Sequence, residues 1–480
     1  MPQVGNLRVR ANRSGNRVPQ RRPQHPLHPC QQGQGEGLPH LSRRPRRRAG
    51  SPDSQTGTGL RPVADSDQPH PDRNRRHLHG RLPQAQVLRP GAAGAQRLMK
   101  KEGMNRFRNL LLWAGLLLLL AACSAPQPQQ VRKRYFWPPG DIAPKIEYIN
   151  FYHADQDVRR GVNDWLEETI FGKDRPRRAF VRPSVVASDG KGRLFVADQG
   201  LSQVQVWDFN THEIRHLRYP SGASFAFQLP AGMTLDDAGH IYVSDSLRKQ
   251  ILVFDDDELV VREIENGALQ RPTGLAFDPV RGGLYVVDTA AHKVHFFDRA
   301  GKLVSSIGGR GVAPGQFNFP VDCAVDSDGN LFVLDSMNAR VQVFDREGGF
   351  VRAFGERGTA LGSFMIPKSI AVSPSNLVYV TDSQAHKFVV FSREGDFLLT
   401  VGGEAPMVDG KVSPGGFYLP EGIDIDSGEA IWVVDSLNRM VHQFQYLTPE
   451  YLAAHPILPG QAFMPPVLQK KLETNGSLNR

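Results

Sequence analysis

The chain has 480 residues and a formal net charge of +9, but this average hides two parts of opposite charge. Residues 1–103 carry 20 Lys or Arg against 6 Asp or Glu, whereas residues 104–480 carry 38 basic and 43 acidic residues. The second part therefore lacks the basic surface that nucleic-acid binding requires, and this function class is excluded for it.

Residues 1–103 have the composition of a disordered segment. They contain no Phe, Tyr, Trp or Ile and are rich in Arg, Pro, Gln and Gly, so they cannot bury enough apolar surface to offset the entropy of ordering. The arginine runs could form a nucleic-acid-binding tail. We favour a second interpretation, translated upstream sequence from a start codon placed too early, because the next segment works only as a true N-terminus.

That next segment reads "MNRFRNLLLWAGLLLLLAAC" from Met104. Arg106 and Arg108 give the positive region, and residues 110–122 form an apolar run. Thirteen residues span about 20 Å as a helix, against about 30 Å of hydrocarbon in a bilayer. Residues 104–122 are therefore predicted to be a signal peptide, not a membrane-spanning helix.

The last four residues of this segment, Leu-Ala-Ala-Cys at 120–123, resemble a bacterial lipobox. The resemblance implies cleavage before Cys123 and a lipid on its sulfur, and Ser124 at the next position favours the outer membrane. The alternative is a secretory signal with a chance cysteine. Residues 123–145 would form the lipidated tether.

The remaining cysteines are Cys30 and Cys323, so no disulfide framework is expected in the mature chain. Cys323 lies in an apolar run and is interpreted as a small buried hydrophobe, with a reactive thiol as the alternative.

From about residue 180 the sequence repeats six times. Each unit opens at a proline with a small apolar run, and a second apolar run then ends in aspartate; these aspartates are Asp198, Asp245, Asp288, Asp335, Asp382 and Asp435. Their spacings are 47, 43, 47, 47 and 53 residues. Two further apolar runs usually follow, which gives four short strands per unit.

Six four-stranded units at this period predict an all-β fold, a six-bladed β-propeller. The stretch "PVDCAVDSDGNLFVLDSMNARVQVFDREGGFVRAFG" from Pro320 resembles the NHL repeat. This resemblance covers residues 180–446. It implies a propeller of NHL type, but it does not identify a function.

The sixth unit lacks a fourth strand after "MVHQFQY". We predict that residues 146–151 supply it and close the ring, within a propeller that spans residues 146–447. Apolar residues at helical spacing predict an amphipathic helix over 156–171. Thr448 and Pro449 predict a short helix at the start of the C-terminal segment 448–480.

Features that recur in every unit are interpreted as scaffold. The six aspartates could form a carboxylate ring for metal binding or acid catalysis, but hydrogen bonding to the following turn is the simpler role. His292 and His386 occupy equivalent turns, and no third metal ligand is evident. The NHL-like amidating lyases use channel histidines and calcium, but no such set maps onto this chain. We expect no cofactor and no catalytic residue.

The candidate binding residues are those that depart from the repeat. Lys368 and Glu421 follow their prolines where most units have a small residue, and Asp322 stands where three others have Gly. With Arg271 they would form a mixed-charge rim at the channel mouth, unless Lys368 and Glu421 form only a structural pair. Asp424 replaces a small residue in its inner strand. The loop at 402–417 is longer than its counterparts, and such loops often carry recognition.

Together these features predict a non-catalytic, membrane-anchored binding module of the bacterial cell envelope, on the periplasmic or surface side of the outer membrane. Its partners would be envelope proteins, and "FWPPGDIAPKIEY" resembles lipoproteins associated with multihaem cytochromes. The alternatives are a metal-dependent lyase or lactonase acting in the channel, and a structural envelope component. Some animal NHL propellers bind RNA, but no nucleic-acid partner is expected for a net negative chain.

Overall fold

The computed structural model describes residues 110, 133–140, 142–159, 177–408 and 410–469. The expectations for the leader at 1–103, the signal peptide at 104–122 and the lipidation of Cys123 lie outside the described residues. The chain divides into two units, Met1–Leu110 and Leu111–Arg480, and the description below concerns the second. None of the described helices is long and apolar enough to cross a membrane.

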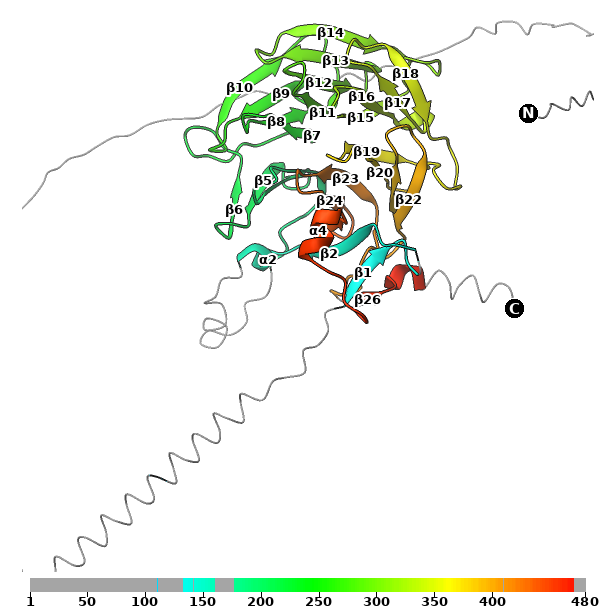
Figure 1. Ribbon diagram of the computed structural model, residues 1–480. Helices are drawn as coiled ribbons and strands as arrows, with labels where there is room; N and C mark the ends of the chain where they lie inside the picture. The colour runs from blue at the N-terminus through cyan, green and yellow to red at the C-terminus, as the bar shows by residue number, and fades with distance from the viewer. Residues whose placement is uncertain (1–109, 111–132, 141, 160–176, 409, 470–480) are drawn as a thin grey trace, which may run out of the picture. The chain divides into compact units, whose positions relative to one another are not determined.

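Six sheets, whose four blade strands pair antiparallel, are arranged in chain order, and we number them as blades one to six by their inner strands (Figure 1). The inner strands all begin at a repeat proline: β3 (Pro183–Ser188), β7 (Pro230–Leu235), β11 (Pro272–Asp278), β15 (Pro320–Val325), β19 (Pro367–Val372) and β23 (Pro420–Ile425). The second strands all end at a repeat aspartate: β4 (Arg193–Asp198), β8 (Ile241–Asp245), β12 (Gly283–Asp288), β16 (Leu331–Asp335), β20 (Val378–Asp382) and β24 (Ala430–Asp435).

The third and fourth strands complete each blade on the outside. The third strands are β5 (Gln203–Asp208), β9 (Gln250–Phe254), β13 (Lys293–Asp298), β17 (Arg340–Phe344), β21 (Lys387–Phe391) and β25 (Met440–Tyr446). The fourth strands are β6 (Glu213–His216), β10 (Val260–Glu265), β14 (Leu303–Gly308), β18 (Phe350–Phe354), β22 (Phe397–Gly402) and, for blade six, β2 (Ile146–Tyr152).

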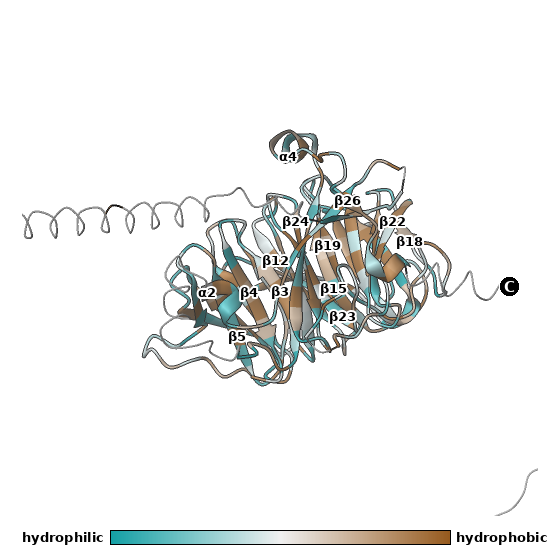
Figure 2. Ribbon diagram, turned by 90° about the horizontal axis from the view of Figure 1, so that it is seen from below, coloured by the Kyte–Doolittle hydropathy of each residue, from teal (hydrophilic) through white to brown (hydrophobic). Residues whose placement is uncertain are grey.

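The core lies between neighbouring blades. Second strands such as β8 and β16 are buried at every residue, because both faces of each sheet are covered by the adjacent sheets. Figure 2 shows the apolar residues gathered in the strands. Each inner strand contacts the inner strand of the next blade, and β23 of blade six contacts β3 of blade one. The ring is thus closed, and the predicted all-β six-bladed propeller is confirmed.

The repeat aspartates tie each blade to the segment that enters it. Asp245 accepts hydrogen bonds from the backbone N of Gln228 (2.7 Å) and Leu229 (3.1 Å), just before Pro230, and from Arg248 N (3.1 Å) in the following turn. Equivalent bonds to the entering segment occur at the other five aspartates. The predicted turn role is therefore correct but incomplete, because the larger share of these bonds secures the entering strand.

The residue after five of the six aspartates joins neighbouring blades. Thr289 Oγ1 donates to the carbonyl oxygen of Pro320 (2.7 Å), and Ser336 Oγ donates to that of Pro367 (2.9 Å). Ser246, Ser383 and Gln199 make the same bond to the next blade's proline. The proline carbonyl needs such a donor because an unpaired buried carbonyl costs free energy.

A second recurring core residue lies three positions before each proline. These residues are Phe180, Phe227, Leu269, Phe317, Phe364 and Phe417, and each is at most 4 % exposed. Phe364, for example, packs with Val341 of blade four and Ile370 of blade five in one apolar cluster. The position fills the space between successive blades.

The closing strand lies where the sequence predicted it. β2 pairs antiparallel with β25, from Ile146 opposite Tyr446 to Tyr152 opposite Val441. In Figure 1 this cyan strand lies beside the red C-terminal segment. The chain thus closes the ring with strands from both of its ends.

Blade six is larger than predicted. β1 (Arg134–Trp137) pairs with β2, and β26 (Ala462–Phe463) pairs in parallel with β1. The prediction that residues 123–145 form only a tether is therefore wrong for 134–137. These residues are strand because Phe136 and Trp137 are buried, at 4 % and 1 % exposure.

The short helices agree with the sequence where they are described. α4 (Pro449–Ala454) begins as predicted, with Thr448 accepting a hydrogen bond from Tyr451 N (3.1 Å). α2 (Gln156–Arg159) covers the start of the helix predicted over 156–171, and the rest of that range lies outside the described residues. A single 3-10 turn, η1 (Ser336–Asn338), follows β16.

Candidate functional site

The inner strands enclose a cavity of about 330 Å³. Its lining includes residues from all six inner strands. A strand advances about 3.3 Å per residue, so a residue's position after its proline sets its depth in the channel. Lys368 and Glu421 stand one residue after their prolines, Asp322 two residues after, and Asp424 four residues after.

Four of the five predicted site residues line this cavity: Asp322, Lys368, Glu421 and Asp424. Arg271 does not. It precedes Pro272, it is exposed, and its backbone N donates to Asp288 (2.9 Å). Arg271 therefore does not share the cavity with the other four, because the residue before a repeat proline belongs to the entering segment that the aspartate holds.

Asp322 is held by the next blade. Its Oδ2 accepts hydrogen bonds from Ser369 Oγ (2.6 Å) and from Ile370 N (3.0 Å). A Cβ on Gly274, the equivalent residue of blade three, would lie 2.2 Å from Asp322 Oδ1, so only glycine leaves room there. Burial raises the pKa of the Asp322 carboxyl to about 6, although these hydrogen bonds oppose the shift.

Ser369 is a site residue that the sequence analysis missed. Its hydroxyl donates to Asp322 and accepts a hydrogen bond from Ile423 N (3.3 Å), so it links blades four, five and six across the channel wall. The sequence did contain an indication of this role. Ser369 occupies the same inner-strand position as Asp322, where three other units have Gly, so it also departs from the repeat.

Asp424 joins blade six to blade one. Its Oδ2 accepts a hydrogen bond from Ser188 N (2.7 Å). Burial raises the pKa of this carboxyl to about 7, and the negative charges of Asp426 and Asp322 raise it further. The groups that shift the pKa of Asp424 include no positively charged side chain that would balance its negative charge. The channel thus holds two carboxyl groups that take up protons near neutral pH.

Glu421 and Lys368 stand at the end of the channel where the inner strands begin. Burial raises the pKa of the Glu421 carboxyl, and the charges of Lys368 and Arg182 oppose this shift. The ion pairs of the described residues do not include one between Lys368 and Glu421. A fixed structural pair, the alternative considered above, is therefore absent from this structure, and Lys368 is exposed.

The two equivalent histidines have a scaffold role. His292 Nδ1 accepts a hydrogen bond from Phe319 N (3.1 Å), and His386 Nδ1 accepts one from Leu419 N (3.2 Å). Each histidine therefore holds the residue before a repeat proline. Within the described part of the chain, no group of three His, Cys, Asp or Glu side chains could hold a metal ion.

Cys323 is buried, at 3 % exposure, in the apolar cluster between blades three and four. Burial raises the pKa of its thiol, and the nearby Asp322 charge adds to this effect. The thiolate is the reactive form of cysteine. The geometry therefore agrees with a small buried hydrophobe and not with a reactive thiol.

The raised pKa of Asp424 predicts a pH-dependent effect of Asp424→Asn. The carboxyl ionises near 3.8 in the unfolded chain and near 7 in the folded one, so the wild type loses stability as pH rises from about 4 to about 7. At pH 8 the variant is expected to be more stable by about 2 kcal/mol. This is about half of what the pKa shift implies, because Asp424 is only partly buried and solvent screens its charge. At pH 4 the two should unfold alike.

Urea unfolding at pH 4 and pH 8 measures this difference. Asp322→Asn serves as the matched variant, and its gain should already be complete near pH 6 to 7. An equal effect of Asp424→Asn at both pH values would show that the Asp424 carboxyl does not change its protonation between the folded and unfolded states in this range.

Comparison with known proteins supports the fold. The family model DUF5128, described as a 6-bladed beta-propeller, matches residues 325–409. No curated protein matches this chain. Among solved structures, a structural genomics protein of unknown function from Bacteroides thetaiotaomicron VPI-5482 is 16% identical, with a TM-score of 0.45 over 57% of this chain and 71% of that one.

Two further solved structures have named activities or ligands. An auxiliary nutrient binding protein from Bacteroides ovatus ATCC 8483 is 14% identical, with a TM-score of 0.44 over 56% of this chain and 70% of that one. A catalytically inactive virginiamycin B lyase from Staphylococcus aureus, solved with quinupristin, is 15% identical, with a TM-score of 0.40 over 58% and 86%. At these identities and TM-scores the likenesses carry no conclusion about this chain.

Proposed function

We propose that this chain is a non-catalytic binding module of the bacterial cell envelope, an NHL-type propeller whose central channel is its ligand site. The observation that carries this proposal is the cavity of about 330 Å³ lined by Asp322, Lys368, Glu421 and Asp424, residues that depart from the repeat. A cavity of this volume suits a small ligand.

The chemistry of the channel favours a polar ligand with a cationic group. Asp322 and Asp424 have pKa values near neutrality because burial disfavours their charged forms. A bound ammonium or guanidinium group would supply the missing counter-charge and restore ionisation. The hydroxyl of Ser369 lies between them in the wall and adds a hydrogen-bonding group.

The sequence before the propeller supports the envelope location. The lipobox-like residues 120–123 follow a signal-like apolar run, and acylation of Cys123 by two or more chains would anchor the protein stably. The proposed destination is the outer membrane, with envelope proteins, such as multihaem cytochromes, as partners. Cys123→Ala is expected to move the protein from the membrane fraction to the soluble fraction.

Native mass spectrometry of the full chain, purified from its own membranes in mild detergent, tests the channel. We expect a small bound molecule that is lost from the Asp322→Asn, Asp424→Asn double variant and kept by Asp345→Asn, which alters a turn remote from the lining. A molecule kept equally by all three proteins would contradict the channel site. A tightly bound metal ion with no other ligand would instead favour the lyase or lactonase alternative.

A further inference from the structure

One face of the propeller carries exposed apolar side chains on separate loops. We define the mouth face as the turns that follow the repeat aspartates, together with the described loop residues at 309–319, 356–366, 403–408 and 410–419 that lead into β15, β19 and β23. These segments lie at the end of the channel where Lys368 stands. Six of their apolar residues are 43 to 77 % exposed: Leu247, Val312, Met337, Leu361, Val408 and Leu437.

Cations without carboxylate partners stand between these apolar residues. Among the described residues at this end of the channel, exposed basic side chains that form no ion pair include Lys249, Arg271, Lys293, Arg310, Arg357 and Arg439. Arg357, for example, donates only to the backbone oxygens of Met337 and Met365. Among the described residues, the exposed carboxylates at this end are Glu265, Glu356 and Glu404. The described residues therefore give the mouth face an excess of uncompensated positive charge.

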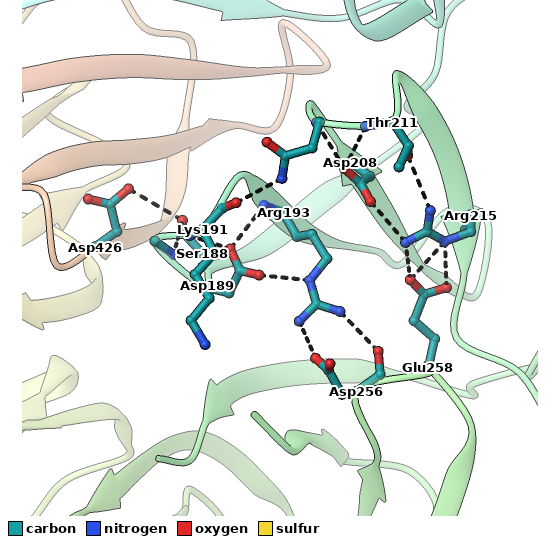
Figure 3. A network of polar contacts seen from close by, with 12 residues as sticks. Ser188, Asp189, Lys191, Arg193, Asp208, Thr211, Arg215, Asp256, Glu258 and Asp426 are labelled. Carbon is teal, nitrogen blue, oxygen red and sulfur yellow. Dashed lines mark hydrogen bonds and ion pairs between the residues drawn. The ribbon is translucent and has the colours of Figure 1, made fainter. Parts of the chain in front are cut away.

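Four arginines at the opposite face are paired with carboxylates. Arg215 contacts Glu258 (2.7 Å), and Arg193 contacts Asp256 of the neighbouring blade, as Figure 3 shows. Arg299 contacts Asp237 (2.7 Å), and Arg393 contacts Asp328. These four arginines of the opposite face are compensated by carboxylates, whereas Arg310, Arg357 and Arg439 of the mouth face form no ion pair.

The pattern on the mouth face fits a lipid surface better than a protein partner. A protein interface has a continuous apolar centre from which charged residues are depleted. Here each apolar side chain stands on its own turn or loop, with a cation nearby: Val312 two residues after Arg310, and Leu361 four residues after Arg357. Apolar side chains that enter the headgroup region, flanked by Arg and Lys, are typical of interfacial membrane binding.

The chain before the propeller is short enough to allow this contact. Nine residues, 124–132, separate Cys123 from the described chain, and they span at most about 35 Å when extended. The closeness of the propeller to the membrane rests on the proposed lipidation of Cys123. Such a tether keeps the propeller close enough to the bilayer for one face to touch it.

We propose that the mouth face docks on an anionic lipid surface, with the six apolar side chains in the headgroup region and the arginines and lysines on lipid phosphates. The channel end nearest Asp424 then faces water and is the open route to the cavity. Docking would hold the propeller in one orientation on its membrane.

A fluorescent probe at Leu361 tests this proposal in the full chain. Cys30→Ser, Leu361→Cys protein is labelled with an environment-sensitive fluorophore and reconstituted into vesicles, and the same chain without Leu361→Cys corrects for Cys123. Brominated lipids should quench the probe in an equal mixture of phosphatidylcholine and phosphatidylglycerol. Quenching should be absent in phosphatidylcholine alone and should disappear in about 0.5 M salt.

Matched variants separate docking from general effects. Val280→Cys places the probe at an exposed turn of the opposite face and should not be quenched. Arg310→Gln with Arg357→Gln should lower the docking constant roughly 30-fold, at about fivefold per charge. Lys191→Gln with Lys302→Gln, exposed cations of the opposite face, should leave it unchanged.

An unquenched probe at residue 361 in the anionic vesicles at low salt would overturn the proposal. So would protection of that probe only after another envelope protein is added, which would assign the face to a protein partner. If the chain stays on the vesicles but the probe is not quenched, the result would agree with the lipid anchor and contradict only the docking of the mouth face. Loss of ligand binding in the channel has no bearing on this result.

Discussion

A chain that begins at residue 153, and so lacks β1 and β2, is expected not to form a stable closed ring. Three of the lost side chains, Phe136, Trp137 and Ile146, are each at most 4 % exposed. Burial of each contributes about 2 kcal/mol. The edge of β25 would also lose its partner from Val441 to Tyr446. The loss of about 6 kcal/mol is comparable with the whole stability of a typical domain.

A chain that begins at residue 133 is the matched control, because it keeps both strands. It should elute as a monomer and show cooperative thermal unfolding, whereas the chain from residue 153 should aggregate or unfold at a much lower temperature. The Arg134–Glu147 ion pair, with contacts of 2.6 and 2.7 Å, joins β1 to β2 in the control. Equal melting temperatures for the two chains would show that the ring does not need its closing strand.

Phe364→Ala is expected to destabilise the propeller by about 3 to 5 kcal/mol, the usual cost of removing a fully buried aromatic ring. Phe364 is 0 % exposed and contacts the ring of Phe391 at 5.7 Å between centroids. Its ring also lies against Gly355, where a Cβ would come within 2.5 Å. Because backbone surrounds the ring on this side, the site cannot collapse to fill the cavity.

Phe350→Ala is the control for this variant. Phe350 lies on the outer strand of blade four and is 40 % exposed, so its removal should cost about 1 kcal/mol or less. Urea unfolding of the two variants and the wild type measures the difference. Similar costs for the two variants would refute the interpretation that the residue three before each proline is a main element of the core between blades.

Most of the fold could be predicted because its signals are local. The prolines mark where inner strands begin, the aspartates mark where second strands end, and alternating apolar runs define strands without knowledge of their neighbours. The missing fourth strand of the sixth unit identified residues 146–151 as the closing strand. The buried apolar residue three positions before each proline recurs just as regularly, yet its role was not predicted. Each of these residues stands alone in a loop, so no alternation of apolar and polar residues around it indicates burial.

The site was predicted only in part, because a side chain's direction across the ring is not a local property. Asp322 and Asp424 departed from the repeat and line the channel. Arg271 was grouped with them, but it precedes its proline and lies outside the cavity lining. Ser369 was overlooked because a serine among small residues carries little signal until its hydroxyl is seen between Asp322 and Ile423.

The sequence by itself determined the number of blades, their strand boundaries, the closure from both chain ends and the residues that break the repeat. The tertiary structure decided which of those residues share the cavity, which carboxyl groups titrate near neutral pH, and where exposed cations stand beside exposed apolar side chains. Strand period and turn chemistry act between residues close in the chain, so they can be read from the sequence. Burial and charge pairing act between blades, so residues such as Asp322 and Ser369, 47 positions apart, meet only when the ring has closed.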